Sequence, residues 1–167
     1  SKFYSSLGTI ETGTDFTDSY EESLKVISES GNGSPEKPWV ISSNQAAELF
    51  LKDTGISRVG GVYQSNLQQK LGLMIIGLEG ENTQPKEYYF DLSHLLNSAN
   101  AYLSTDKTQD SDNPWPLLRL LSESRDSAAQ AAIGAYLVKK KNYKAAINWL
   151  TASSQQDNLF AHTLLAR

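Results

Sequence analysis

The sequence predicts a mainly helical protein, and three observations support this fold class. Apolar residues recur at helical spacing in several segments, residues suited to helix N-capping precede these segments, and the C-terminal third contains three of them in succession. The chain has 167 residues, which is close to the ~150 residues of one domain. Apolar residues make up 39% of it. We therefore expect an irregular N-terminal arm at 1–17 and a single helical domain at 18–167, with about seven helices.

The composition excludes several classes of function. Fifteen basic and 19 acidic residues give a net charge of −4, which is of the wrong sign for nucleic acid or anionic lipid. The absence of cysteine excludes disulfides and thiolate zinc sites. His94 and His162 lack partners at metal-ligand spacing, so we expect neither a metal nor a cofactor. The longest apolar run, at 71–78, is far shorter than the ~20 residues of a membrane span.

Two amphipathic helices are predicted in the first third of the chain. One covers 18–30, where apolar residues fall on one side and acidic residues occupy the first turn. A loop rich in Gly and Pro follows and leads into an extended segment at 39–42. The second helix covers 44–54, with Ser42 or Ser43 as its N-cap.

The segment after Gly60 admits two interpretations. A helix over 65–77 is favoured, because apolar residues recur there at i, i+4, i+7 and i+11. The alternative is a small β-hairpin near 71–92, in which LGLMIIGL (71–78) pairs with EYYFDL (87–92). Further helices are predicted over 91–103 and from about Pro114, separated by a surface loop.

Three consecutive helices are predicted at the C-terminus, starting at Asp126, Asn142 and Asp157, which are all suited to N-capping. The first of them is apolar nearly all round, so we expect it to be covered on two sides. The lysines at 139–141 follow its last turn, where cations complement the helix dipole. A clamp for a partner carboxylate is the less favoured interpretation of this triplet.

The segment at about 126–167 resembles a tetratricopeptide-type helical repeat, especially its bacterial Sel1-like variety. Ala129 aligns with Ala161 and Ile133 with Leu165, which gives a period of 32 residues against about 34 in the tetratricopeptide unit. In such repeats, a glycine at the position of Gly134 permits close approach of the second helix. The residues that carry this resemblance are Ala129, Ile133, Gly134, Tyr143, Ala145, Ala146, Trp149, Leu150, Ala152, Ala161 and Leu165.

This resemblance implies a protein-binding scaffold without a catalytic centre. Ala131, Ala135, Val138 and Lys139 match groove-facing positions of the first repeat helix. Three of these four side chains are small or aliphatic, so the groove is expected to bind apolar side chains of another protein or peptide. No nucleophile elbow, phosphate loop or dinucleotide motif occurs in the chain, and we therefore expect no enzyme.

The predicted function is non-catalytic protein binding, as an adaptor or assembly factor of a bacterial cell envelope. The missing initiator Met, the lack of cysteine and the Ser-, Asn- and Gln-rich loops favour a periplasmic location. One alternative is a stoichiometric inhibitor or immunity protein that acts on a toxin or enzyme. The other is a small-ligand-binding or enzymatic α+β domain, favoured if 71–92 forms a hairpin in one sheet with 39–42. The oligomeric state stays open.

Overall fold

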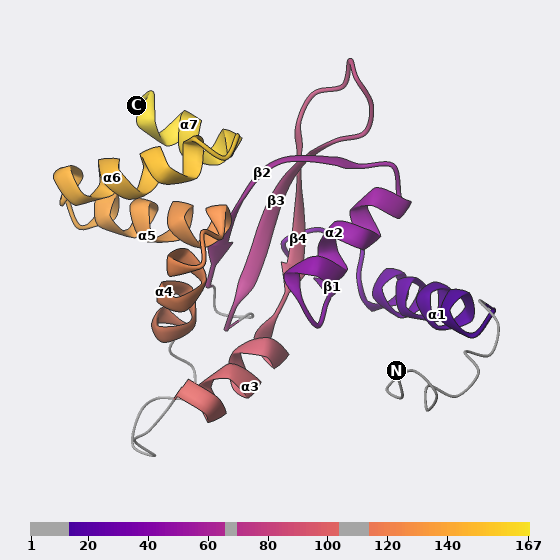
Figure 1. The fold of residues 1–167 in the computed structure, drawn as a ribbon. Helices are drawn as coiled ribbons and strands as arrows, with labels where there is room; N and C mark the ends of the chain where they lie inside the picture. Colours follow the sequence, from indigo (N-terminus) through magenta and orange to yellow (C-terminus); the bar gives the residue numbers. More distant parts are fainter. Residues whose placement is uncertain (1–13, 66–69, 104–113) are drawn as a thin grey trace, which may run out of the picture.

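A computed structural model describes residues 14–65, 70–103 and 114–167 and has an α+β fold (Figure 1). Within these residues, seven helices surround one four-stranded sheet. The prediction of a mainly helical protein is therefore wrong. The elements are α1 (Thr14–Ser30), β1 (Trp39–Val40), α2 (Asn44–Asp53), β2 (Ser57–Gln64), β3 (Gly72–Leu78), β4 (Lys86–Asp91), α3 (Ser93–Leu103), α4 (Trp115–Glu123), α5 (Ser127–Lys139), α6 (Tyr143–Ser154) and α7 (Leu159–Leu165).

The sheet has the strand order β1-β4-β3-β2. β1 runs parallel to β4, and the other pairs are antiparallel, with Leu73 opposite both Phe90 and Tyr63. β3 and β4 form the hairpin that the sequence offered as an alternative, so the favoured helix over 65–77 is wrong. The hairpin also shares its sheet with Trp39, as the α+β interpretation required.

β3 is one of the two inner strands of the sheet, next to β4, and it is buried on both faces. A strand of this kind needs a continuous apolar run rather than alternation, and such a run also satisfies a helical period over a short window. Gly72 and Gly77 disfavour a helix at its two ends, and the β-branched Ile75 and Ile76 favour a strand.

β2 is a strand that the sequence analysis did not predict, and it contains Gly60 and Gly61. The two glycines are required by close approach to neighbouring chain segments. A Cβ on Gly60 would lie 2.9 Å from the Asn158 Oδ1, and a Cβ on Gly61 would lie 2.9 Å from the Met74 carbonyl oxygen. A bulge between Arg58 and Gly60 shifts the register of the strand at this point.

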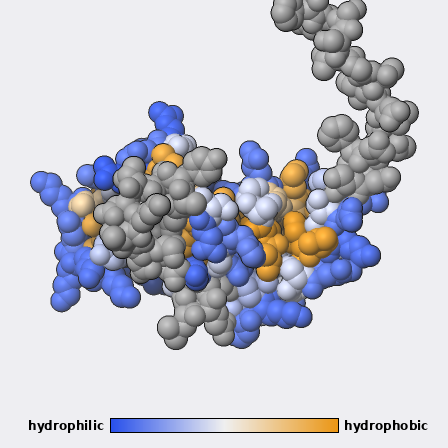
Figure 2. All heavy atoms as spheres, turned by 90° about the horizontal axis from the view of Figure 1, so that it is seen from below, coloured by the Kyte–Doolittle hydropathy of each residue, from blue (hydrophilic) through white to orange (hydrophobic). Residues whose placement is uncertain are grey.

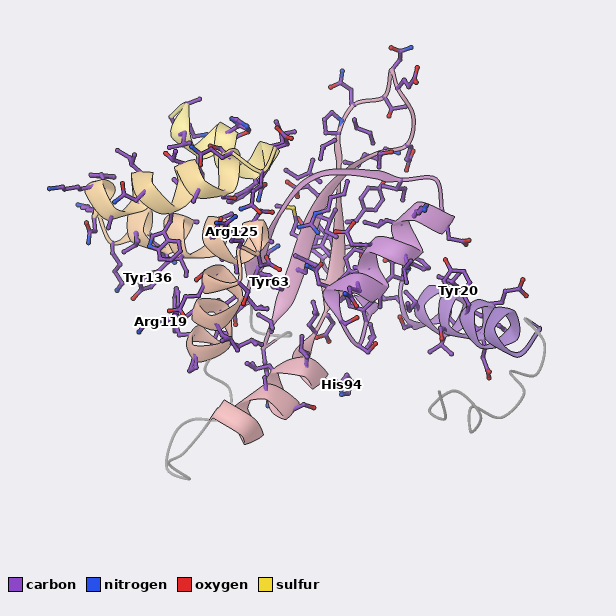
Figure 3. The ribbon with its side chains drawn as sticks, viewed as in Figure 1. Tyr20, Tyr63, His94, Arg119, Arg125 and Tyr136 are labelled. Carbon is purple, nitrogen blue, oxygen red and sulfur yellow. The ribbon has the colours of Figure 1, made fainter. Side chains whose placement is uncertain are left out.

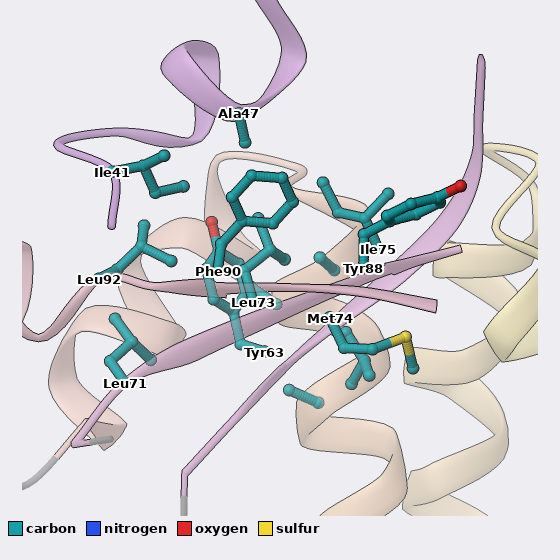
Figure 4. Close-up of a cluster of buried hydrophobic side chains, with 14 of the residues drawn as sticks. Ile41, Ala47, Tyr63, Leu71, Leu73, Met74, Ile75, Tyr88, Phe90 and Leu92 are labelled. Carbon is teal, nitrogen blue, oxygen red and sulfur yellow. The ribbon is translucent and has the colours of Figure 1, made fainter. Parts of the chain in front are cut away.

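The core lies between the sheet and the helices packed on it (Figure 4). Phe90 is fully buried, and the indole of Trp39 contacts it at a ring-centroid distance of 5.5 Å. The same indole meets the ring of Phe50 on α2 at 4.8 Å and stacks on Tyr88 at 6.1 Å. These aromatic contacts attach β1 and α2 to the sheet.

The predicted C-terminal helices are present as α5, α6 and α7. The side chains of Asp126 and Asn142 cap α5 and α6, but the cap of α7 is Asn158 rather than Asp157. α5 is covered by β2, α4 and α6, in agreement with its apolar sequence. A Cβ on Gly134 would lie 2.6 Å from the Leu150 side chain, so this glycine allows the close approach of α5 and α6.

The side-chain amide of Asn158 joins the C-terminal helices to the outer edge of β2. Its Oδ1 accepts hydrogen bonds from the backbone N–H groups of Gly61 (3.0 Å) and Phe160 (3.1 Å). Its Nδ2 donates to the Gly61 carbonyl (2.8 Å), the Ser127 carbonyl (3.2 Å) and the Ser153 Oγ (3.0 Å). Asn158 is only 1% exposed, and it closes the sheet edge much as a neighbouring strand would.

The N-terminal boundary differs slightly from the prediction. α1 begins at Thr14, so the last residues of the predicted arm are helical. The rest of that arm, like the predicted loop at 104–113, lies outside the described residues. None of the helices in the described ranges is both long and apolar enough to cross a lipid bilayer.

Candidate binding groove

The four residues predicted to line a partner groove do not share an exposed surface. Ala131 is fully buried and belongs to the core. Ala135 and Val138 are half-buried, and Lys139 is exposed at the end of α5. β2, α4 and α6 all pack against this helix.

An open groove of about 720 Å³ lies instead between α1, α2, the segment that joins β1 to α2, and the start of α3. Seen from below, apolar side chains gather at the end of the molecule that carries α1 and α2 (Figure 2). The lining residues are Tyr20, Glu22, Ser23, Leu24, Val26, Ile27, Val40, Ile41, Ser42, Ser43, Gln45, Ala46, Leu49 and His94.

The groove has a buried apolar floor and an exposed apolar rim. Ile27 and Ile41 are 8% and 2% exposed and form part of the continuous core. Val26 and Leu49 are 61% and 47% exposed, and Tyr20 on α1 is 39% exposed. Exposed apolar side chains that adjoin a groove mark a surface that gains free energy when a partner covers it.

The local sequence explains why the groove is open. α1 carries Leu24 and Ile27 on its inner side and contacts β1. α2 starts at the Ser43 cap, whose Oγ accepts a hydrogen bond from the backbone N–H of Ala46 at 3.1 Å. α1 and α2 are thus each anchored to the sheet region from one side, and Val26 and Leu49 extend from them into solvent.

The charged residues at the groove are acidic. Glu22 lines the groove, and the lining residues within the described part of the chain include no lysine or arginine. Between Tyr20 and Ser30, α1 carries Glu21, Glu22 and Glu29 against the single cation Lys25. Lys25 lies 3.9 Å from the carboxylate of Glu29 in an exposed ion pair. The electrostatic potential of this rim therefore favours a positively charged partner.

A second cluster of polar side chains joins α2, β2 and α5 (Figure 3 labels Tyr63). Arg58 forms an ion pair with Glu48 and lies 3.5 Å from the Asn44 Oδ1. The Oδ2 of Asp126 accepts hydrogen bonds from the Asn44 Nδ2 (3.2 Å) and the Tyr63 hydroxyl (3.3 Å). Burial, and then the charge of Asp126, raise the pKa of Tyr63 far above its ordinary value.

The hydrogen bonds of this cluster join α2, β2 and α5. Its polar groups bond to one another, and Asp126 also caps α5 by accepting a hydrogen bond from the Ala129 N–H at 2.9 Å. Tyr63 is only 3% exposed, so its hydroxyl is not presented to a substrate. Among the residues that the structure describes, no three acidic or histidine side chains converge on a metal position.

The sequence analysis placed several groove residues on the apolar side of the first helix but did not predict a groove there. Tyr20, Leu24 and Ile27 were found by helical spacing, which indicates an apolar face without showing what covers it. Leu49 was a usable signal, because the second helix contains more apolar residues than a single buried stripe requires. The two histidines are separated in space as in sequence: His94 lines the groove, and His162 lies on α7.

No protein-family model, curated protein or solved structure matches the chain. The resemblance of the C-terminal segment to a tetratricopeptide-type repeat therefore stays a prediction. What the structure defines is an α+β protein with an apolar groove at one end and a group of packed helices at the other (Figure 1).

Proposed function

We propose that the protein is a non-catalytic binding module whose α1–α2 groove holds an amphipathic helix of a partner protein. The partner helix carries apolar anchors on one face and Lys or Arg beside them. The observation that supports this most directly is the continuity between the buried floor of the groove, at Ile27 and Ile41, and its exposed rim, at Val26 and Leu49.

A helix suits this groove because two helices form much of its walls. A third helix can lay an apolar stripe with i, i+3 and i+4 spacing between two others, as in other helix-in-groove complexes. Burying the exposed parts of Tyr20, Val26 and Leu49 would contribute favourable free energy at about 25 cal/mol per Å². Well-packed anchors of this kind supply most of the affinity in such interfaces.

Basic flanks follow from the charge of the rim. Glu22 lines the groove, Glu21 precedes it on α1, and the lining residues that the structure describes include no lysine or arginine. Opposite charges at the rim increase the association rate and disfavour acidic partners. An adaptor, an assembly factor and a stoichiometric inhibitor would all use a surface of this kind.

A small apolar ligand is the second candidate, and two observations favour it. The 39–40 strand and the 72–91 hairpin share one sheet, and a groove of about 720 Å³ is within the usual range of ligand sites. However, a small ligand in the floor would leave Val26 and Leu49 largely uncovered. A partner helix covers both the floor and the rim.

The test measures binding of a fluorescent synthetic helix of about four turns, with leucines at i, i+3 and i+4 spacing and lysines elsewhere. We expect fluorescence anisotropy to show saturable binding that Leu49→Glu weakens about tenfold or more, equivalent to about 1.4 kcal/mol. Leu120→Glu is the matched control, because Leu120 on α4 is also 47% exposed and lies outside the groove.

Two results would overturn the proposal. One is equal affinity of the synthetic helix for the Leu49→Glu and Leu120→Glu variants. The other is equal binding of a peptide in which glutamates replace the lysines, since the acidic rim should reject it. Tight binding of a small apolar fluorophore that the synthetic helix fails to displace would support the small-ligand alternative instead.

A further inference from the structure

Four exposed lysines gather where α5 turns into α6. Lys139, Lys140, Lys141 and Lys144 lie within six consecutive residues, and none forms an ion pair within the described part of the chain. The Lys140 ammonium lies 5.6 Å from the centroid of the Tyr136 ring. We call these four lysines, together with the neighbouring Tyr143 and Ile147, the lysine corner.

Local stability accounts for only half of this cluster. Lys139 and Lys140 lie at the C-terminal end of α5, where cations complement the helix dipole. Lys141 adopts φ 60°, a left-handed conformation that Gly or Asn takes at lower cost. Lys144 lies in the first turn of α6, where the dipole disfavours a cation. Helix stability therefore explains Lys139 and Lys140 but neither the left-handed conformation at Lys141 nor the position of Lys144.

The lysine corner also carries apolar anchors. Tyr143 and Ile147 are 57% and 54% exposed and lie one turn apart on the same side of α6. With Lys144 on the same helix and Lys140 at the C-cap of α5, they form a basic surface that carries two apolar anchors on a helix. This is the class of ligand proposed above for the α1–α2 groove, so the present inference rests on that proposed function.

The groove and the lysine corner lie at opposite ends of the molecule (Figure 1). α1 is at one end and the α5–α6 turn is at the other, with the sheet between them, so one chain cannot fill its own groove. We propose that the lysine corner of one copy docks in the α1–α2 groove of another copy, head to tail. A contact of this kind joins two different surfaces, so repeated contacts build either a closed ring or an open chain of molecules.

The test measures mass by analytical ultracentrifugation over a range of about 10 μM to about 1 mM. We expect the average mass to rise with concentration at low salt and to return towards the monomer at about 1 M salt, where the Debye length falls to about 3 Å. Lys140→Glu/Lys144→Glu removes the corner, and Leu49→Glu removes the groove. Each variant alone should stay monomeric.

A mixture of these two variants gives the most specific result. The Lys140→Glu/Lys144→Glu variant retains an intact groove, and the Leu49→Glu variant retains an intact lysine corner. An equimolar mixture of the two should therefore form dimers that do not grow further. Lys37→Glu/Lys86→Glu is the charge control, since both lysines are exposed, lie outside the groove and corner, and change the net charge equally. This control should associate like the original chain.

The inference is overturned if the original chain stays monomeric throughout the range, if removing the corner leaves association unchanged, or if the mixture forms no dimers. Binding of the synthetic leucine–lysine helix to the Lys140→Glu/Lys144→Glu variant distinguishes a failure of the head-to-tail inference from a failure of the proposed function. Binding without self-association refutes only the head-to-tail contact. Loss of both refutes the groove as well.

Discussion

The two edges of the sheet are covered in different ways. At β2, the edge is closed by α5 and α7, and the Asn158 side chain bonds to both backbone groups of Gly61. At the other edge, β1 is only two residues long, and the adjoining α1–α2 end keeps an open groove with an exposed rim. The comparison shows that the β2 edge is closed by buried contacts, whereas the β1 edge adjoins the groove for which we propose a partner helix.

The largest loss of stability is expected from Asn158→Ala. The substitution leaves the Gly61 N–H and C=O buried and unpaired, and each unpaired group costs about 1–3 kcal/mol. We expect the free energy of unfolding to fall by about 3–5 kcal/mol, measured by denaturant titration.

Asn142→Ala is the control for this prediction, because the Asn142 side-chain oxygen also caps a helix, α6, but the residue is exposed. Loss of a helix cap alone costs about 1 kcal/mol. Equal losses in the two variants would show that Asn158 acts only as a cap and that the β2 edge does not depend on it.

Gly60→Ala should have the next largest effect. The added Cβ would lie 2.9 Å from both the Asn158 Oδ1 and the Leu159 backbone nitrogen, so the α7 end must shift. We expect a loss of about 1–3 kcal/mol. In the double variant with Asn158→Ala, the loss should be smaller than the sum of the two single losses. Strict additivity would argue against this contact.

Alkaline pH should destabilise the protein through its buried tyrosines. Burial, followed by the hydrogen bond to Glu79, raises the pKa of Tyr88 to about 12, and burial raises the pKa of Tyr63 further. The unfolded chain loses these protons from about pH 10. The neutral tyrosines therefore contribute stability that is complete below about pH 10 and is lost as the pH rises through their folded pKa values.

Denaturant titrations at about pH 9 and about pH 11 check this prediction. Tyr63→Phe removes the hydrogen bond to Asp126, worth about 1 kcal/mol, but it should reduce the further loss at the higher pH. Tyr143→Phe, at an exposed hydroxyl on α6, should leave that loss unchanged. An identical alkaline loss in all three proteins would exclude Tyr63 as a cause.

The smallest effect on stability is expected at the groove rim. Leu49 is 47% exposed, so Leu49→Glu should change the free energy of unfolding by no more than about 0.5 kcal/mol. The same denaturant titration measures it. A loss of several kcal/mol would mean that Leu49 is part of the core and that the groove is closed in solution.

Local signals predicted the C-terminal helices well. Capping residues such as Asp126 and Asn142 and the close approach at Gly134 depend on residues near in sequence or on one helix pair. The α1 and α2 helices were predicted for the same reason. Their helical spacing identified Leu24 and Ile27 as an apolar face but not as the side of a groove.

The sheet could not be predicted in the same way, because its strands depend on residues far away in sequence. β3 is apolar throughout since it is buried on both faces, and its pattern matched a helix equally well. β2 contains Gly60 and Gly61, whose role depends on Asn158 almost 100 residues later. Ala131, which was predicted to contact a partner, is buried because α5 packs on β2, and β2 lies far away in sequence.

The most direct test of the different roles of the two ends is amide hydrogen exchange, with and without the synthetic leucine–lysine helix. We expect the Gly61 amide and those of α5 to exchange slowly in both states, and the amides of α1 between Tyr20 and Ser30 to exchange faster in the free protein. The bound helix should slow exchange only around the groove, in α1, in α2 and in the segment that joins β1 to α2. Protection of β2 or of α5–α7 by the helix, with no change in α1, would contradict this account.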